Sequence, residues 1–278
     1  MSLRRMGLLS GGGASVDANR QFIIDNASFF HDFHLLTGDE GDGITADVID
    51  LTGNGYDLED ASPAATGGAK VGKANFYETE VTCAKLKQTA AAPNVLMFKQ
   101  GVDSLFLDNG DFEYLWQGFL PEGTSQIDLI GFFDNSDSGV IIQINYTTAQ
   151  ILLFSGSATI ANETAWESEA IFPANPTPVG GFTLRFSINK TGAVNPRVFL
   201  NGVERTFSLK AGGWGAFSNW DPATFNSGNI KPPVGGYSLS GVLRDRPDRN
   251  FLCSRHAFFN RVLTDEEASQ VLQAFTTY

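Results

Sequence analysis

The stretch F-F-N-R-V-L-T-D-E-E, from Phe258 to Glu267, carries the clearest structural signal in this sequence of 278 residues. Its apolar start has the composition of a β-strand, and Thr264 followed three residues later by Glu267 forms a capping box, which marks a helix start. Arg261 is placed to bind backbone carbonyls or the Glu267 carboxylate where strand meets helix. The apolar stripe that follows at helical spacing comprises Ala268, Val271, Leu272 and Phe275. We therefore expect the chain to end with a strand and a short helix packed on the body.

The chain upstream of this ending consists of short apolar runs separated by Gly, Asn, Asp and Pro, a pattern typical of short antiparallel strands and their turns. In R-V-F-L-N-G-V-E-R, Asn201 and Gly202 predict a hairpin, because a type I′ turn needs φ > 0 at both central residues. Two segments lack such runs, 59–92 and 210–236, and we expect insertions or long loops there. The predicted strands are 28–36, 56–58, 95–98, 104–107, 113–119, 127–133, 139–145, 150–155, 182–189, 196–200, 203–209 and 251–260.

The composition favours one large two-sheet domain. Hydrophobic residues make up 42% of the chain and 23 residues are Phe, which suits the space between two packed sheets. The formal net charge of −12 argues against nucleic acid as a partner, and no apolar run is long enough to span a membrane. The start also lacks the apolar core of a Sec signal peptide.

Two cysteines and three histidines offer little chemistry. Cys83 and Cys253 are far apart in sequence, so they are either two buried free thiols or one long-range disulfide. His31 and His34 are expected to face opposite sides of a strand, which prevents them from sharing a metal without further ligands. With His256, they are interpreted as core or sheet-surface residues rather than as catalytic groups.

Residues 1–28 differ from the rest of the chain. They combine a basic start with a triple glycine at Gly11 to Gly13, and they read either as a disordered leader or as an arm that becomes ordered on a neighbouring subunit. We therefore expect an N-terminal arm or leader over 1–28 and a single domain over 29–278.

Three motifs occur in an order that resembles a known family. They are D-L-T-G-N-G-Y-D-L at Asp50 to Leu58, V-F-L-N-G-V at Val198 to Val203, and the strand-to-helix ending at Phe258 to Glu267. Together they resemble the laminin G-like branch of the concanavalin A-like lectin/glucanase superfamily. The resemblance covers nearly all of 29–278 and implies an all-β, two-sheet antiparallel jelly-roll sandwich with a short C-terminal helix. The start R-R-M-G-L-L-S-G-G-G is similar to the starts of some bacteriophage particle proteins with a lectin-like domain.

The resemblance does not bring catalytic residues with it. Glucanases of this superfamily carry an E-x-D-x-x-E strand, because retaining hydrolysis needs two carboxyl groups about 5 Å apart. The nearest match here is Glu40-Gly-Asp42-Gly-Ile-Thr45, which lacks the last acid. We therefore expect a protein that is not an enzyme, with glucan hydrolysis as the least favoured reading.

Calcium is the metal that the resemblance implies, held by loop carboxylates at one end of the sandwich. The candidate ligands lie in D-N-G-D-F-E and D-N-S-D-S-G, and are Asp108, Asp111, Asp134 and Asp137. The alternative for both loops is an ordinary Asp/Asn hairpin turn.

Glycan binding needs an aromatic platform beside planar polar groups, and the 210–236 segment offers both. Its candidate carbohydrate-binding residues are Trp214, Phe217, Asn219, Trp220, Asp221, Phe225 and Asn226. The alternative is that these rings cover the sandwich core or fill a subunit contact.

These observations lead to two hypotheses of different classes. The first is a non-catalytic structural or accessory virion protein, a head decoration or tail-associated protein, displayed on the virion surface after synthesis in the host cytoplasm. Its arm would contact other particle proteins or further copies of itself. The second is a calcium-assisted carbohydrate-binding module for host or environmental polysaccharide, extracellular by a route other than Sec.

Overall fold

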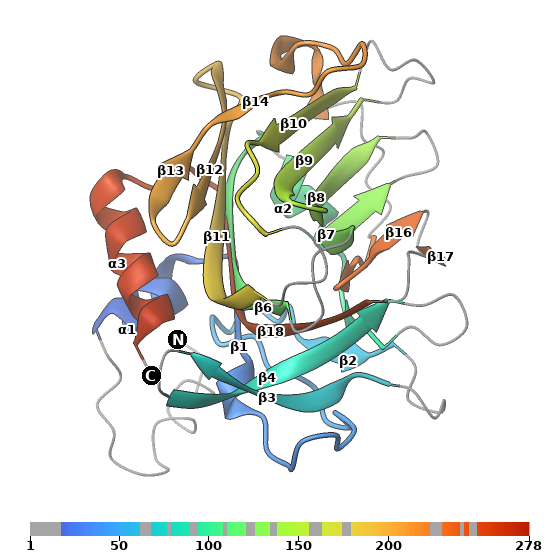
Figure 1. The fold of residues 1–278 in the computed structure, drawn as a ribbon, viewed down its shortest axis with the longest axis vertical. Coiled ribbons are helices and arrows are strands. Elements are labelled where there is room, and N and C mark those ends of the chain that lie inside the picture. The colour runs from blue at the N-terminus through green and yellow to red at the C-terminus, as the bar shows by residue number, and fades with distance from the viewer. Residues whose placement is uncertain are drawn as a thin grey trace.

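The computed structural model shows a two-sheet β-sandwich with helices at one side (Figure 1). The residues that it describes are 18–61, 68–76, 79–88, 94–107, 110–120, 126–133, 138–155, 163–173, 179–222, 230–239, 242–244 and 249–277. The predicted all-β jelly-roll class is confirmed by this architecture.

The first sheet, sheet A, has the strand order β13-β12-β11-β6-β18-β4-β3. The strand β1 pairs with the second half of β18, where β4 no longer accompanies it. The strands of sheet A are β1 (Phe29–Asp32), β3 (Lys70–Phe76), β4 (Thr79–Gln88), β6 (Asp111–Leu120), β11 (Val179–Asn189), β12 (Val194–Leu200), β13 (Val203–Arg205) and β18 (Arg249–Phe259).

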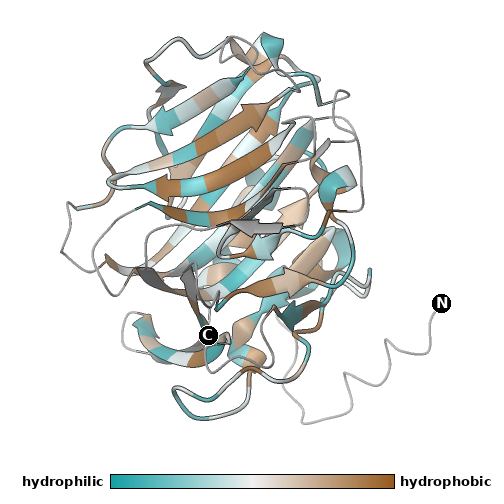
Figure 2. Ribbon diagram, turned by 90° about the vertical axis from the view of Figure 1, so that its right-hand side faces the viewer, coloured by the Kyte–Doolittle hydropathy of each residue, from teal (hydrophilic) through white to brown (hydrophobic). Residues whose placement is uncertain are grey.

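The second sheet, sheet B, has the order β14-β10-β9-β8-β7-β15-β5-β2, with β16 parallel to β7 and paired to β17. Figure 2 shows apolar runs broken by polar residues along its central strands, and β7 and β8 are buried over nearly their whole length. The strands of sheet B are β2 (Leu58–Asp60), β5 (Leu96–Phe98), β7 (Ile127–Phe133), β8 (Gly139–Asn145), β9 (Thr148–Phe154), β10 (Thr164–Ser168), β14 (Phe207–Leu209), β15 (Pro233–Val234), β16 (Tyr237–Leu239) and β17 (Val242–Arg244).

Two hydrophobic layers explain why the middle strands of sheet A are buried on both faces. Along β6, Tyr114 and Trp116 point into the main core between the sheets. Leu115 points the other way, into a second cluster beneath the helices α1 (Ala18–Asn26) and α3 (Asp265–Thr276). Because successive strand residues face opposite sides, one strand supports both layers.

The C-terminal strand and helix form as the sequence predicts. Thr264 Oγ1 accepts from the Glu267 backbone N–H at 3.2 Å, and the Glu267 carboxylate accepts from the Thr264 N–H at 2.9 Å. Arg261 donates to both Glu267 oxygens at 2.8 Å. At the other end of α3 the buried Arg255 donates to the carbonyl of Ala274 at 2.7 Å, a contact that sequence patterns did not reveal.

The early D-L-T-G-N-G turn is organised by Asp50. This buried carboxylate accepts from the backbone N–H groups of Phe30 and Thr52 at 3.1 Å, and from that of Tyr56 at 3.2 Å. The turn therefore fixes β1 against the start of sheet B.

The Asn201–Gly202 hairpin is also confirmed. Both residues have positive φ, 51° and 79°. Asn201 Oδ1 accepts from the Thr183 N–H of β11 at 2.8 Å, so the turn is tied to its own sheet.

Four predictions of local structure are wrong. The expected strand 203–209 forms two strands, β13 in sheet A and β14 in sheet B. The expected long loop 59–92 contains the β3–β4 hairpin, and the expected strand 104–107 is the short helix α2 (Asp103–Leu107). The strand expected over 28–36 stops at Asp32, where the 3-10 helix η2 (Phe33–Leu35) begins.

Residues 18–26, which the sequence analysis assigned to the N-terminal arm, form α1 and pack against α3. Ile23 is fully buried, and Asn19 donates to the Gln273 side chain at 3.0 Å. Residues 1–17 of the expected arm lie outside the described residues. Within the described ranges, no helix is both long and apolar enough to cross a membrane.

The two cysteines are free thiols, and both are buried. Burial raises the pKa of Cys83 to about 12 and that of Cys253 well above its usual value. The reading as two buried thiols is therefore confirmed over a long-range disulfide.

Candidate recognition rim

One end of the sandwich gathers several of the sequence-predicted site residues. Asn189, at the end of β11, pairs with Asp111, at the start of β6. The turn that follows β11 folds back onto that aspartate, because the Thr191 backbone N–H donates to Asp111 Oδ1 at 2.8 Å. One of the predicted metal ligands therefore sits beside the β11–β12 turn.

The segment 214–222 crosses this end and contacts both sheets, toward the top of Figure 1. Lys190 Nζ, from the sheet A turn, donates to the carbonyls of Phe217 and Ser218 at 3.1 and 3.0 Å. On the sheet B side, the Asp221 backbone N–H donates to Ser155 Oγ at 2.8 Å, just beyond the end of β9. We call the group Asp111, Lys190, Thr191, Trp214, Asn219 and Asp221 the loop rim.

Trp214 lies at the sheet B edge of the loop rim. The next residue, Gly215, donates from its backbone N–H to the carbonyl of Glu163 at 2.7 Å, immediately before β10. The Trp214 ring is half-buried, so part of its surface faces solvent. Of the predicted aromatic platform residues within the described ranges, Trp214 is the one with an accessible ring.

Phe217 and Trp220 are corrected from candidate ligand contacts to core residues. They are 5% and 0% exposed, belong to the main core, and stack with ring centroids 6.0 Å apart. A buried ring cannot offer its face to a sugar, so for these two the alternative of covering the core holds. Their burial anchors the 3-10 helix η4 (Phe217–Asn219), which holds Asn219 and Asp221 outward as exposed residues. Phe225 and Asn226 lie outside the described residues.

The loop rim carries charges of both signs. Partial burial lowers the pKa of Lys190, and the nearby Asp221 carboxylate offsets part of that shift. Lys190 also lies 5.3 Å from the centre of the Phe217 ring. The loop rim therefore presents amide, carboxylate and aromatic groups next to Lys190, whose ammonium group is already hydrogen-bonded to two backbone carbonyls.

The described residues do not by themselves form a calcium site. Among them, no group of three or more His, Cys, Asp or Glu is placed to hold a metal. Asp111 already uses one carboxylate oxygen for Thr191. The other three candidates, Asp108, Asp134 and Asp137, lie outside the described residues. The strand ends around the last two, Phe133 and Gly139, lie next to Phe154, at the end of the sandwich that carries the loop rim.

Several acids of the described chain are held by structural contacts. Asp32 pairs with Arg20 and Arg255 at 2.9 and 3.2 Å, and Asp103 accepts from the Ile230 N–H at 3.0 Å. Glu40 is exposed, and Asp42 accepts from the Asp39 N–H at 2.9 Å within its own turn. Glu40 and Asp42, the nearest match to the glucanase motif, therefore lie in an exposed turn rather than on a strand.

His31 and His256 lie side by side in the hydrophobic core. The His31 and His256 rings stack with centroids 4.7 Å apart, and both side chains are fully buried. His31 Nε2 lies 2.8 Å from the carbonyl of Tyr56. Burial lowers the pKa of both imidazoles, in the case of His31 to about 4, so both are neutral at pH 7.

Lys190 and Thr191 are the rim residues that sequence reasoning missed. Their signal is the N-K-T-G-A-V-N stretch after a strong β-run, which indicates a turn. That turn meets the aromatic segment through the hydrogen bonds from Lys190 to the carbonyls of Phe217 and Ser218. No short-range pattern reports such a contact.

No protein-family model and no curated protein matches the sequence. Solved structures match in fold, and several of them are binding domains of botulinum neurotoxins. The serotype C1 binding domain has a TM-score of 0.57 at 12% identity, over 92% of this chain and 53% of that chain. A second structure comes from work describing the cell entry of botulinum neurotoxin type C as dependent on interaction with two ganglioside molecules. It has a TM-score of 0.59 at 12% identity, over 92% of this chain and 52% of that chain. The DC binding domain in complex with rat synaptotagmin II gives 0.58 at 12% identity, over 92% and 53%.

The present chain thus spans about half the length of these solved domains. The likeness establishes the β-sandwich fold along nearly the whole chain, and the matched structures are binding domains rather than catalytic ones.

Proposed function

We propose that this chain is a non-catalytic recognition domain that binds a glycan at the loop rim, and that it is displayed on the surface of a bacteriophage particle. The observation that carries the proposal is the convergence of Trp214, Asn219 and Asp221 on one end of the sandwich, held there by two buried rings. An aromatic surface beside amide and carboxylate groups is what sugar recognition requires.

The fold supports the same function. Jelly-roll sandwiches carry their variable loops at the ends, where a rigid scaffold positions binding residues. The matched neurotoxin structures are binding domains, one of them in complex with synaptotagmin and one described through ganglioside interaction. The display on a particle is supported by the similarity of the first residues to bacteriophage particle proteins and by the resemblance to the laminin G-like branch.

A glycan array with the full chain tests the recognition site. We expect one class of glycan to bind, and Trp214→Ala to weaken that binding at least tenfold. The matched control is Tyr146→Asn, which removes the exposed Tyr146 ring from the β8–β9 turn at the opposite end of the sandwich. Asn tolerates the positive φ of 57° at that position. Binding that survives Trp214→Ala but disappears in Tyr146→Asn would move the site away from the loop rim.

The same array repeated with EDTA tests the calcium part of the proposal. If Asp108, Asp111, Asp134 and Asp137 hold calcium, EDTA should abolish binding and added Ca²⁺ should restore it. Unchanged binding in EDTA removes calcium and leaves the rim side chains alone as the recognition surface.

Mass spectrometry of purified particles from the source tests the display. Recovery of the chain at many copies per particle supports it, and absence from particles contradicts it. Release of reducing sugar from any bound glycan, lost when a single carboxylate is changed, would contradict the non-catalytic assignment.

A further inference from the structure

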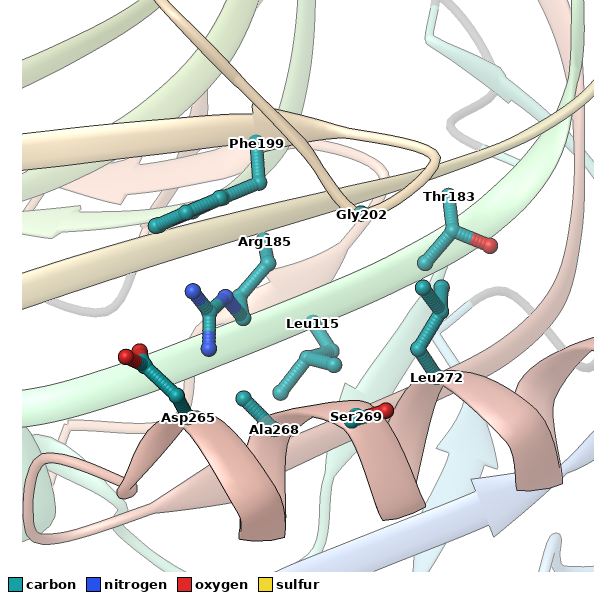
Figure 3. Close-up of a pocket in the computed structure, with 9 residues that line it drawn as sticks. All are labelled: Leu115, Thr183, Arg185, Phe199, Gly202, Asp265, Ala268, Ser269 and Leu272. Carbon is teal, nitrogen blue, oxygen red and sulfur yellow. The ribbon is translucent and has the colours of Figure 1, made fainter.

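A pocket of about 250 Å³ lies on the outer face of sheet A, and none of its lining residues belongs to the loop rim (Figure 3). Its floor is β6 and β11, one wall is α3, and the other is the β12–β13 hairpin. The nine residues that line it are Leu115, Thr183, Arg185, Phe199, Gly202, Asp265, Ala268, Ser269 and Leu272.

Arg185 is held in this pocket by its neighbours while its hydrogen-bond donors remain available. The guanidinium carbon lies 3.6 Å from the centre of the Phe199 ring, and the side chain is only 11% exposed. Its one ion pair within the described chain is with the buried Glu113, at 3.5 Å. A guanidinium has five N–H donors in a fixed plane, so a single long contact leaves most of them for a ligand.

Asp265 supplies the opposite charge at the same end of the pocket. It is exposed, and among the described residues it forms no ion pair within 4.0 Å. Its charge nevertheless acts on Arg185, since it raises the pKa of that group against the lowering effect of burial. Figure 3 shows both charged groups at one end and Leu272 with Thr183 at the other.

The rest of the pocket is apolar or weakly polar. Leu115, Ala268 and Leu272 cover its lower side, and Gly202 closes the far end without a side chain. The fitting ligand therefore has two opposite charges close together and a short apolar tail.

We propose that this pocket binds a free α-amino acid with an aliphatic side chain. The carboxylate accepts from Arg185, the ammonium group donates to Asp265, and the side chain lies on Leu115, Ala268 and Leu272. Such a ligand has no net charge, so the acidic chain, with a formal charge of −12, does not repel it as it would a monoanion. The volume is below the roughly 300–1,000 Å³ of pockets for drug-sized ligands, in keeping with a molecule of this size.

Calorimetric titration of the full chain with L-leucine tests the proposal directly. We expect saturable one-to-one binding. N-acetyl-L-leucine lacks the ammonium group, L-leucinamide lacks the carboxylate and glycine lacks the tail, so each should bind at least tenfold more weakly. Equal binding of N-acetyl-L-leucine or L-leucinamide would overturn the assignment of the two charges, and the absence of saturable leucine binding would overturn the site.

Three variants place the site. Asp265→Asn removes the ammonium partner from an exposed position, and Ser269→Leu fills the pocket from its exposed helix wall; both should weaken leucine binding at least tenfold. Arg197→Gln is the control, because Arg197 also lies over the Phe199 ring, at 4.8 Å, yet does not line the pocket. Leucine binding that is unchanged in both Asp265→Asn and Ser269→Leu would overturn the proposal, whatever the result at the loop rim.

Discussion

Thr264 and Glu267 hold the start of α3 through reciprocal hydrogen bonds, with Arg261 forming a bidentate pair on the same carboxylate. These contacts lower the pKa of Glu267 to about 2. Because the carboxylate is stabilised in the folded state, this contribution is present above about pH 4.5 and is lost as the pH falls toward 2. The strand-to-helix motif at Phe258 to Glu267 therefore also contributes to the stability of the protein in acid.

We predict that Thr264→Ala lowers the free energy of unfolding by about 1 kcal/mol, the usual loss for a helix N-cap. Denaturant unfolding followed by circular dichroism measures it. Thr276→Ala is the control, since the Thr276 hydroxyl donates within the last turn, to the carbonyls of Leu272 and Gln273. Equal losses in the two variants would show that the capping box does not stabilise α3.

The stacked His31 and His256 rings predict a loss of stability in mild acid. Their folded-state pKa values are lowered by burial, and the unfolded chain takes up protons near pH 6.5. The folded state therefore binds fewer protons, and stability falls as the pH drops from about 6.5 toward 4. Asp50 and Asp57 oppose this for His31, while Tyr114 is the polar group that faces His256.

His256→Phe tests this source of acid sensitivity. Phe keeps the ring stack and removes one titrating group, while Tyr114 Oη loses its 3.5 Å contact with His256 Nδ1. The variant should therefore keep a larger share of its pH 8 stability at pH 5 than the native chain does. His31 is left intact because its ring bonds to the Tyr56 carbonyl, which would lose its partner. An identical pH profile for both proteins would assign the acid sensitivity to other groups.

Single residues also mark where sequence reasoning ends. The sequence shows that 214–220 is aromatic, but it does not show which of these rings face the core. That depends on contacts with Lys190 and Ser155, which lie just after strands that are far away in sequence. Phe217 and Trp220 are buried by contacts between segments that are distant in sequence. The hydropathy of a Phe or Trp is the same whether its ring is buried in the core or exposed to bind a ligand.

At the scale of elements, the β12–β13 hairpin and α3 are packed as one unit. A Cβ built on Gly202 would lie 2.4 Å from Leu272 Cδ2, so the turn needs glycine both for its positive φ and for its contact with the helix. Gly213 has a similar φ of 89° and open space around its Cβ position.

Replacing each of these glycines by Ala separates the two effects. We predict that Gly213→Ala loses about 1 kcal/mol from backbone strain alone. Gly202→Ala should lose more than this, because the end of the Leu272 side chain must also move to make room for the added methyl group. Thermal and denaturant unfolding of both variants measure the difference, and equal losses would mean that the hairpin does not press on the helix.

Elements whose signal lies within a few neighbouring residues were predicted correctly. Elements stabilised mainly by contacts with strands or helices distant in sequence were not. The Asn201–Gly202 turn and the capping box are encoded within a few residues. In contrast, β4 reads T-E-V-T-C-A-K-L-K-Q, whose charged and small residues hide a strand that gains its stability between β3 and β18. The apolar residues Phe22 to Ile24 of α1 are adjacent in sequence and make no helical stripe, and α1 packs on the cluster that it shares with α3.

At the scale of the whole molecule, α1 belongs to the folded domain although it lies within the expected N-terminal arm. Ile23 of α1 and the following Ala27 are buried in the cluster beneath α3, and Arg20 pairs with the buried Asp32 at 2.9 Å. Removing residues 1–28 therefore removes part of the fold together with the expected arm, and a loss of assembly in that variant would have two explanations.

Two truncations separate these explanations. Deletion of 1–28 should lower the free energy of unfolding by at least about 2 kcal/mol, since one fully buried Ile already contributes about that much. Deletion of 1–17 keeps α1 and should leave the thermal midpoint unchanged. If residues 1–17 are an assembly arm, the shorter deletion should nevertheless lose self-association or incorporation into particles, measured by light scattering and by particle binding. Retained assembly in a stable 1–17 deletion would contradict the arm, because the only part then missing is the segment to which assembly was assigned.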